Sequence, residues 1–174
     1  MSKLEVDVAR PIVRWLRREG WEVYQEVSLG YGDSCCDIVA KSGSLLWAVE
    51  VKRSKTIALV DQARVWLGHA HLVSVATPTS KRRTAYRLRA ASTWDWLCEQ
   101  FGLGQFEVGD SVRVTAWPRV ARRVDSTLRN ALHRAQKSMV EAGAAGGGHW
   151  TAFRSTVEKL TKLVERRPGI AIGD

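Results

Sequence analysis

The chain has 174 residues, of which 45% are hydrophobic and 26% charged, and this suits one globular domain with a sizeable core. It carries 27 Lys and Arg against 18 Asp and Glu, a formal net charge of +9, and such a basic surface favours a polyanionic partner such as nucleic acid. The three cysteines form no CxxC pair, so neither a zinc ribbon nor a disulfide framework is indicated. No signal peptide or membrane-spanning run is evident, so we expect a cytoplasmic protein without membrane contact.

Hydrophobic periodicity predicts a helix over residues 3–19, in which Pro11 marks either a kink or the start of the regular part. Alternating side chains predict a strand at 21–27. Two further strands are expected at 35–40 and 45–52, joined by a short hairpin-like connection. The first part of the chain is therefore one helix followed by three strands.

The next elements are a helix at 57–70, a buried strand at 71–77, a short helix at 93–101 and strands at 105–108 and 112–117. The element order is thus α-β-β-β-α-β followed by α-β-β. This order predicts an α/β fold in which helices flank a mixed central sheet.

The character of the chain changes after residue 118. A basic helix is expected over 121–140, a glycine-rich linker over 142–148 and an amphipathic helix over 151–167. The sequence therefore predicts two parts, an α/β domain at 1–118 and a small, basic helical region at 119–174.

Asp37, Glu50 and Lys52 stand out because each lies in a strand that otherwise has the composition of a core. Glu50 and Lys52 are two residues apart, so alternation places them on one face of their strand, and the short connection brings Asp37 near Glu50. Ionised groups near a core are costly unless they are paired or bind a metal. The alternative is a surface Glu–Lys pair on an edge strand, with Asp37 at a strand end.

Two carboxylates at this position would form an oxygen site suited to Mg²⁺ or Mn²⁺. Such an ion polarises a phosphate oxygen and lowers the pKa of a bound water. Lys52 would orient or deprotonate the attacking water, or stabilise the charge that develops on the phosphate, and the sequence leaves these roles open.

The arrangement Glu5, Asp37, Glu50-Val51-Lys52 and Gln62, on an α-β-β-β-α-β order, resembles the PD-(D/E)XK nuclease superfamily over roughly residues 3–80. The superfamily includes restriction endonucleases, Holliday-junction resolvases, recombination exonucleases and repair nickases. The resemblance therefore implies a restriction-endonuclease-like core and a Mg²⁺ or Mn²⁺ cofactor. At the position of the proline that gives the family its name this chain has Cys36, a departure that many members share.

The resemblance implies a role for each residue of the central motif. Asp37 and Glu50 would be the metal-binding carboxylates, and the backbone carbonyl of Val51 would be a further metal ligand. Lys52 would be the catalytic lysine.

Two residues on helices complete the resemblance. Glu5 would hold a metal-bound water from the first helix, and Gln62 would lie near the active site on the helix that follows the third strand. From the residues alone, Glu5 is as well explained as a solvated residue favoured by the helix dipole, and Gln62 as a surface residue.

Basic side chains are expected to contact DNA phosphates in a salt-sensitive and largely sequence-independent manner. The candidates are Lys55, Lys81, Arg82, Arg83, Arg122, Arg123, Arg129, Arg134 and Lys137. The alternative is that these residues form solvated helix faces. The tail at 151–174 resembles the opening helix of a helix-turn-helix module, or else serves as a dimerisation helix.

We therefore predict a divalent-metal-dependent DNA endonuclease that hydrolyses phosphodiester bonds in DNA repair, recombination or branched-DNA processing. Its partner would be DNA, and cutting both strands would favour a homodimer. Two non-catalytic alternatives remain: a DNA-binding regulator that acts through its C-terminal helices, and a nuclease-like structural subunit of a larger complex.

Overall fold

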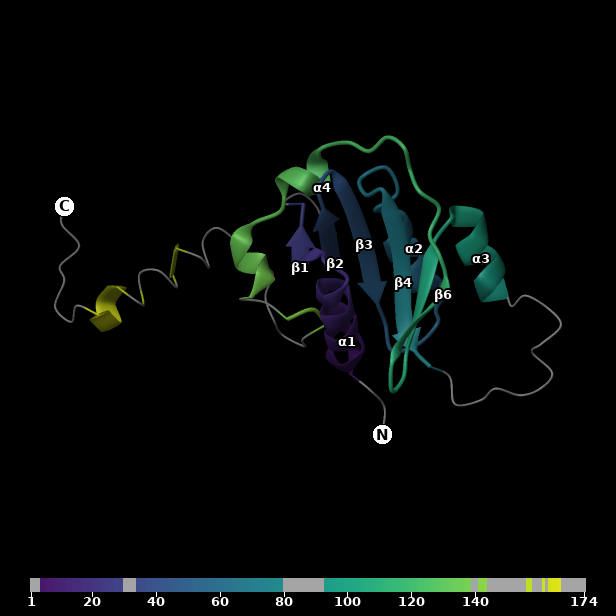
Figure 1. Ribbon diagram of the computed structural model, residues 1–174, viewed down its shortest axis with the longest axis horizontal. Helices are drawn as coiled ribbons and strands as arrows, with labels where there is room; N and C mark the ends of the chain where they lie inside the picture. The colour runs from purple at the N-terminus through teal and green to yellow at the C-terminus, as the bar shows by residue number, and fades with distance from the viewer. Residues whose placement is uncertain are drawn as a thin grey trace.

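The computed structural model describes residues 4–29, 34–79, 93–138, 141–143, 156–157, 161 and 163–166. These residues form a six-stranded mixed sheet with helices on both faces (Figure 1). The expected α/β fold with a mixed central sheet is therefore confirmed. Among the helices in these ranges, none is both long and apolar enough to cross a membrane.

The strands lie side by side in the order in which they occur along the chain. They are β1 (Glu22–Ser28), β2 (Cys35–Ser42), β3 (Leu45–Val51), β4 (Leu72–Pro78), β5 (Gly104–Val108) and β6 (Val112–Ala116). β1, β2 and β3 pair antiparallel, β3, β4 and β5 pair parallel, and β6 returns antiparallel to β5. The three parallel strands therefore end at the same end of the sheet, which we call its carboxyl end, and begin at its amino end.

α1 (Glu5–Arg18) covers one face of the sheet. Val8, Ile12 and Leu16 form its buried stripe, as the periodicity predicts, and pack in one core with side chains of the central strands. The helix is continuous through Pro11, since the fixed φ of proline fits a helix although its ring removes one backbone donor. Its first residue, Glu5, lies at the carboxyl end of the sheet, where its side chain pairs with Lys52.

α2 (Ile57–Arg64) and α3 (Thr93–Phe101) cover the opposite face, where Leu59 of α2 joins Leu46 and Ala48 of β3 in a second core. Two separate cores, one on each face, are what an α/β sheet buried on both sides requires.

The helix predicted over 57–70 is shorter than expected, because α2 ends at Arg64. In the following residues the N–H of Trp66 donates to the carbonyl three residues before it rather than four, which tightens the turn. Gly68 then takes a φ of +92°, a conformation that glycine adopts readily. The side chain of Trp66 lies in the core that α2 shares with β3.

The single long helix predicted over 121–140 is wrong. The described part of this segment holds two short helices, α4 (Thr127–Asn130) and the 3₁₀ helix η2 (Arg134–Lys137). Before α4 the chain forms neither helix nor strand, and its backbone bonds to loops at the amino end of the sheet. The N–H groups of Arg119, Ala121 and Asp125 donate to the carbonyl oxygens of Gly102, His71 and Gly68. These backbone bonds replace those that a continuous helix would make.

Two other expectations for the C-terminal region fall mostly on residues outside the described ranges. Of the linker expected at 142–148, only 142 and 143 are described, and Ala142 is fully buried in the core beneath α1. Of the helix expected at 151–167, residues 156–157, 161 and 163–166 are described, and all are helical.

Candidate active site

The carboxyl groups of Asp37 and Glu50 meet at the carboxyl end of the sheet. The last residues that β2 and β3 pair at this end are Ile38 and Val49. Beyond them, the N–H of Val51 donates to Oδ2 of Asp37 at 2.7 Å, so the carboxylate takes the place of a partner strand. Asp37 and Glu50 are also hydrogen bonded to each other. The structure thus brings together the two acids that the sequence singled out.

Glu50 is oriented by a tryptophan that the sequence analysis did not assign to the site. The indole Nε1 of Trp66 donates to Oε1 of Glu50 at 2.6 Å, and both residues are buried. Trp66 has the spacing of a core residue on the predicted helix, and a hydrophobic pattern says nothing about where an indole N–H points. No signal in the sequence identifies this contact.

Burial shifts the protonation of both acids. It raises the pKa of Glu50 well above its ordinary value, and the neighbouring Asp37 raises it further. It also raises the pKa of Asp37, to about 6, although the hydrogen bond from Val51 acts in the opposite direction. Two carboxyls in contact and out of solvent retain a proton between them unless a cation offsets their charge.

Lys52 follows β3 directly, and its N–H donates to the carbonyl of Ala76 at 3.0 Å. Its Nζ lies 3.5 Å from Oε2 of Glu5, and both side chains are about one third exposed. The positive charge of Lys52 lowers the pKa of both Asp37 and Glu50, as expected for a neighbouring cation. Glu5 therefore belongs to the same group of side chains, since it holds the lysine.

A fourth acid, Glu26, is one that the sequence analysis missed. The register of β1 and β2 pairs Gln25 with Ile38 and Val27 with Cys36, which places Glu26 opposite Asp37. Its charge contributes to the raised pKa of Asp37. In an antiparallel hairpin, residues at equal distances from the connecting loop lie opposite each other, so the sequence would identify Glu26 as the neighbour of Asp37 once the register of the two strands is known.

Gln62 forms no hydrogen bond with this group of side chains. It lies on the exposed side of α2, and its side chain forms no hydrogen bond with the described residues. Its placement near the active site stays a prediction of the family resemblance.

The predicted phosphate-binding residues fall at different places around the sheet. Lys55 lies in the loop after β3, and its Nζ forms an ion pair at 3.2 Å with Glu107, near the carboxyl end of β5. Lys81, Arg82 and Arg83 lie outside the described residues. Of these four residues, Lys55 is the one that the structure describes, and it lies at the same end of the sheet as Glu50.

Arg122, Arg123 and Arg129 lie at the amino end. Arg129 donates to the carbonyl oxygen of Ser44, in the turn that precedes β3. Arg122 and Arg123 are exposed on the extended segment that bonds to His71 before β4. Because β3 has seven residues, about 20 Å of strand separate these arginines from the acids at its other end.

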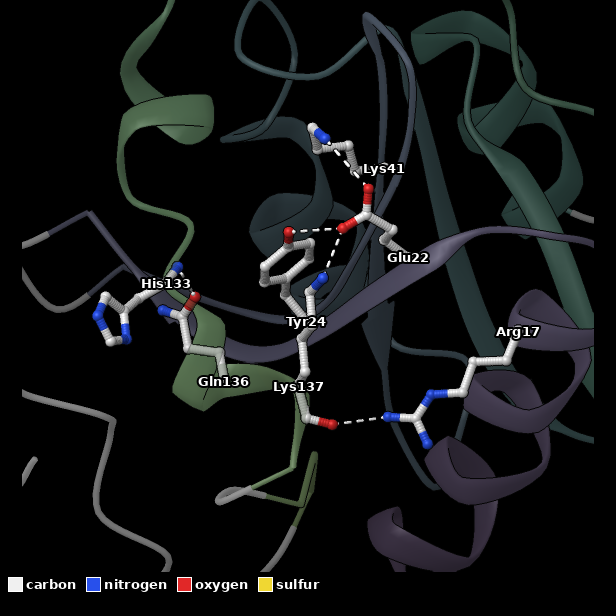
Figure 2. A network of polar contacts seen from close by, with 7 residues as sticks. All are labelled: Arg17, Glu22, Tyr24, Lys41, His133, Gln136 and Lys137. Atoms are coloured by element: carbon white, nitrogen blue, oxygen red, sulfur yellow. Dashed lines mark hydrogen bonds and ion pairs between the residues drawn. The ribbon is translucent and has the colours of Figure 1, made fainter. Parts of the chain in front are cut away.

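Lys137 contacts protein side chains, and Arg134 is exposed on the same turn of η2. Figure 2 shows Lys137 reaching across β1 to the carboxylate of Glu22, at 2.5 Å. Its ammonium lies 4.9 Å from the ring centre of Tyr24. Lys137 therefore anchors η2 to the sheet.

Among the described residues, no group of three or more His, Cys, Asp or Glu side chains is arranged to hold a metal ion. Asp37 and Glu50 supply two carboxylates in contact, and the carbonyl of Val51 stays a predicted third ligand. A cation bound here would complete its coordination with water or with oxygens of a substrate.

No protein-family model matches this chain, and no curated protein matches it. A solved structure of a protein of unknown function from Silicibacter pomeroyi, SPO1766, is similar to it with a TM-score of 0.50 and 12% sequence identity, over 100% of both chains. At this identity the likeness concerns the fold alone.

Proposed function

We propose that this chain is a divalent-metal-dependent DNA endonuclease of the PD-(D/E)XK kind, acting in DNA repair, recombination or the processing of branched DNA. The observation that carries the proposal is the contact between the half-buried Asp37 and the buried Glu50 beside Lys52, at the carboxyl end of the sheet. The order α1-β1-β2-β3-α2-β4, with β3 and β4 parallel, supports a restriction-endonuclease-like core.

The paired acids fit a hard divalent cation. When both are ionised they repel one another out of solvent, and a cation between them offsets both charges. Carboxylate oxygens are the ligands that Mg²⁺ and Mn²⁺ prefer. Asp37 and Glu50 would hold the ion, with the carbonyl of Val51 as a further ligand. When bound, the ion supplies an activated water and polarises a phosphate oxygen.

The surrounding residues hold these groups in place. Trp66 and the N–H of Val51 each fix one carboxylate oxygen, which limits the rotation of both acids. Lys52 offers positive charge to a phosphate, and Glu5 pairs with its ammonium group.

The test is cleavage of labelled single-stranded, duplex, flap and four-way-junction DNA with Mg²⁺, Mn²⁺ or EDTA. Wild type would be compared with Asp37→Asn and Lys52→Ala. Asp61→Asn is the matched control, because Asp61 is exposed on α2 and pairs with its helix neighbour Arg64. We expect metal-dependent cleavage in wild type and the control, and a loss of at least a hundredfold in both site variants.

The outcomes separate the nuclease from its alternatives. If wild type binds DNA but cuts none of these substrates with either metal, the chain is a DNA-binding protein without this activity. If Asp37→Asn and Lys52→Ala cut as well as the control, the activity belongs to another site. The DNA structure that is cleaved fastest would show whether the enzyme acts as a resolvase or as a repair nickase.

A further inference from the structure

The C-terminal strap, residues 134–143 in their described part, wraps from β1 onto α1. At its start, Lys137 pairs with Glu22, which also accepts from Lys41 and Tyr24. The guanidinium of Arg17 on α1 donates to the carbonyl of Lys137 at 2.7 Å (Figure 2). The strap is therefore fastened to both the first strand and the first helix.

The strap ends with three consecutive residues that each bond to α1 or β1. Glu141 forms an ion pair with Arg10 at 2.7 Å. The N–H of Ala142 donates to Oε1 of Gln25 at 3.2 Å, and Ala142 has no exposed surface. The N–H of Gly143 donates to Oε1 of Glu26 at 3.0 Å. This spacing brings the strap to the acid that lies opposite Asp37.

Gly143 is pressed against the first turn of α1. A Cβ on this residue would lie 2.8 Å from the carbonyl carbon of Glu5 and from the nitrogen of Val6. Those are backbone atoms of a packed helix and do not give way as a flexible side chain does. Its φ of +74° also disfavours any other residue. The position therefore fixes the backbone of Glu5, whose carboxylate holds Lys52.

Glu26, which accepts the N–H of Gly143, has an unusual backbone conformation. Its φ is +53°, in the left-handed region that a non-glycine residue occupies at a cost of about 1 kcal/mol or more. Both of its carboxylate oxygens are engaged, one by Gly143 and the other by the thiol of Cys35 at 3.6 Å. Such strain persists where the surroundings impose it, and it clusters at functional sites.

We infer that Glu26 is a positioning residue of the proposed active site and acts through the strap. The carboxylate of Glu26 accepts a hydrogen bond from Gly143, and Gly143 packs against the backbone of Glu5. The side chain of Glu5 then holds the ammonium of Lys52 beside Asp37 and Glu50. The inference rests on the proposed function for its effect on catalysis. The contacts themselves are testable without it.

The first test is Gly143→Ala against Gly43→Ala. Both glycines have positive φ, but a Cβ on Gly43, in the turn at the amino end of β3, meets nothing within 4 Å. We expect Gly143→Ala to lower kcat for DNA cleavage at least tenfold, with KM within about twofold of wild type, because Lys52 is displaced and the DNA-binding surface is not. Equal kcat in the two variants would overturn the inference.

The second test compares Glu26→Gln with Glu26→Ala. The glutamine keeps an oxygen that accepts the N–H of Gly143, so a positioning role predicts that it retains kcat within about threefold while the alanine loses tenfold or more. If Glu26→Gln is as inactive as Asp37→Asn, Glu26 ligates the metal, and the positioning role is wrong.

A third measurement separates the strap from the nuclease proposal. Amide hydrogen exchange of Gly143 by NMR should be slow in wild type and in Glu26→Gln, and fast in Glu26→Ala. The side-chain signal of Lys52 should shift in Gly143→Ala and not in Gly43→Ala. If these hold in a protein that cuts no DNA, the nuclease proposal fails and the coupling of the strap to Lys52 stands. If the Gly143 amide exchanges freely in wild type, the strap inference fails whatever the activity.

Discussion

At the scale of single residues, the pair of Asp37 and Glu50 sets the behaviour of the site. Trp66 and Val51 hold the two carboxyls in contact, away from solvent. A protein gains nothing in stability from two ionised acids that repel one another where solvent screens them poorly. Their arrangement stabilises the metal-free protein only while a proton remains between them.

The first prediction follows from the pKa of Asp37, which is raised from an ordinary 3.8 to about 6. The folded state binds the proton more tightly than the unfolded chain does, so this group favours folding most below pH 4. The contribution is lost as the pH rises through about 6. In EDTA, Asp37→Asn should therefore lose less stability than wild type between pH 4 and 7, with a melting temperature at pH 7 raised by several degrees.

Thermal unfolding of both proteins across this pH range, with Asp61→Asn as the control, measures the effect. Parallel curves for wild type and Asp37→Asn would show that Asp37 ionises as it does in the unfolded chain. Adding Mn²⁺ should raise the melting temperature of wild type at pH 7 and leave that of Asp37→Asn nearly unchanged.

The sequence reaches some of these residues and not others for a physical reason. Asp37, Glu50 and Lys52 are charged residues in strands of apolar composition, and that contrast is visible in the sequence. Glu26 and Trp66 are defined by what their side chains touch. Those contacts depend on the strand register and on the early end of α2, which periodicity does not determine.

At the scale of elements, η2 is held by a charged contact rather than by an apolar stripe. Glu22 accepts from Lys137, and Lys41 and Tyr24 contribute to the same carboxylate. Lys137 is the largest cause of the lowered pKa of Glu22, about 2 against an ordinary 4.5. The depressed pKa means that the contact favours folding above pH 4.5 and is lost as the pH falls toward 2.

We predict that Lys137→Ala raises the pKa of Glu22 by at least one unit, leaving it below 4.5 because Lys41 and Tyr24 remain. Titration of the Glu22 carboxyl carbon by NMR measures this, and Arg18→Ala, an exposed change on α1, should leave it unchanged. An unaltered pKa in Lys137→Ala would mean that η2 does not dock through this contact.

The order of helices and strands was predictable up to β6, apart from the early end of α2, because each element has its own periodicity and turn residues. The segment after β6 was not. Its basic amphipathic pattern between 121 and 140 predicts a helix, yet the N–H groups of Arg119, Ala121 and Asp125 find carbonyl partners in loops of the sheet. Leu128 of α4 still fills the core that the pattern requires. Tertiary hydrogen bonds therefore override local propensity here.

At the scale of the whole molecule, Arg122, Arg123 and Arg129 lie at the opposite end of the sheet from the acids Asp37 and Glu50. A duplex that touched both ends would span about 20 Å, or roughly six base pairs at ~3.4 Å each. We predict that the double variant Arg122→Ala/Arg123→Ala weakens DNA binding. The slope of log affinity against log salt concentration should become shallower by about 2, as expected for the loss of about two phosphate contacts. The kcat at saturating DNA should stay within about twofold, because neither arginine is near Lys52.

Binding measured by fluorescence anisotropy between 50 and 300 mM salt, over which the screening length falls from about 14 to about 6 Å, gives this slope. Arg18→Ala is the single-charge control. A double variant with the wild-type slope would place the DNA elsewhere, with Lys55 as the next residue to change.

The strap also affects the order in which the site is completed while the chain is being synthesised. Gly143 lies 117 residues after Glu26, the acid that it bonds to. During synthesis from the N-terminus, β1, β2 and β3 with their acids emerge well before residue 143 exists. At about 5–20 residues per second, the ninety or so residues between Val51 and Gly143 take roughly 5 to 20 seconds. For that interval a nascent chain carries the acids without the strap residue that packs against Glu5, so Lys52 would be set in place only after residue 143 has been made.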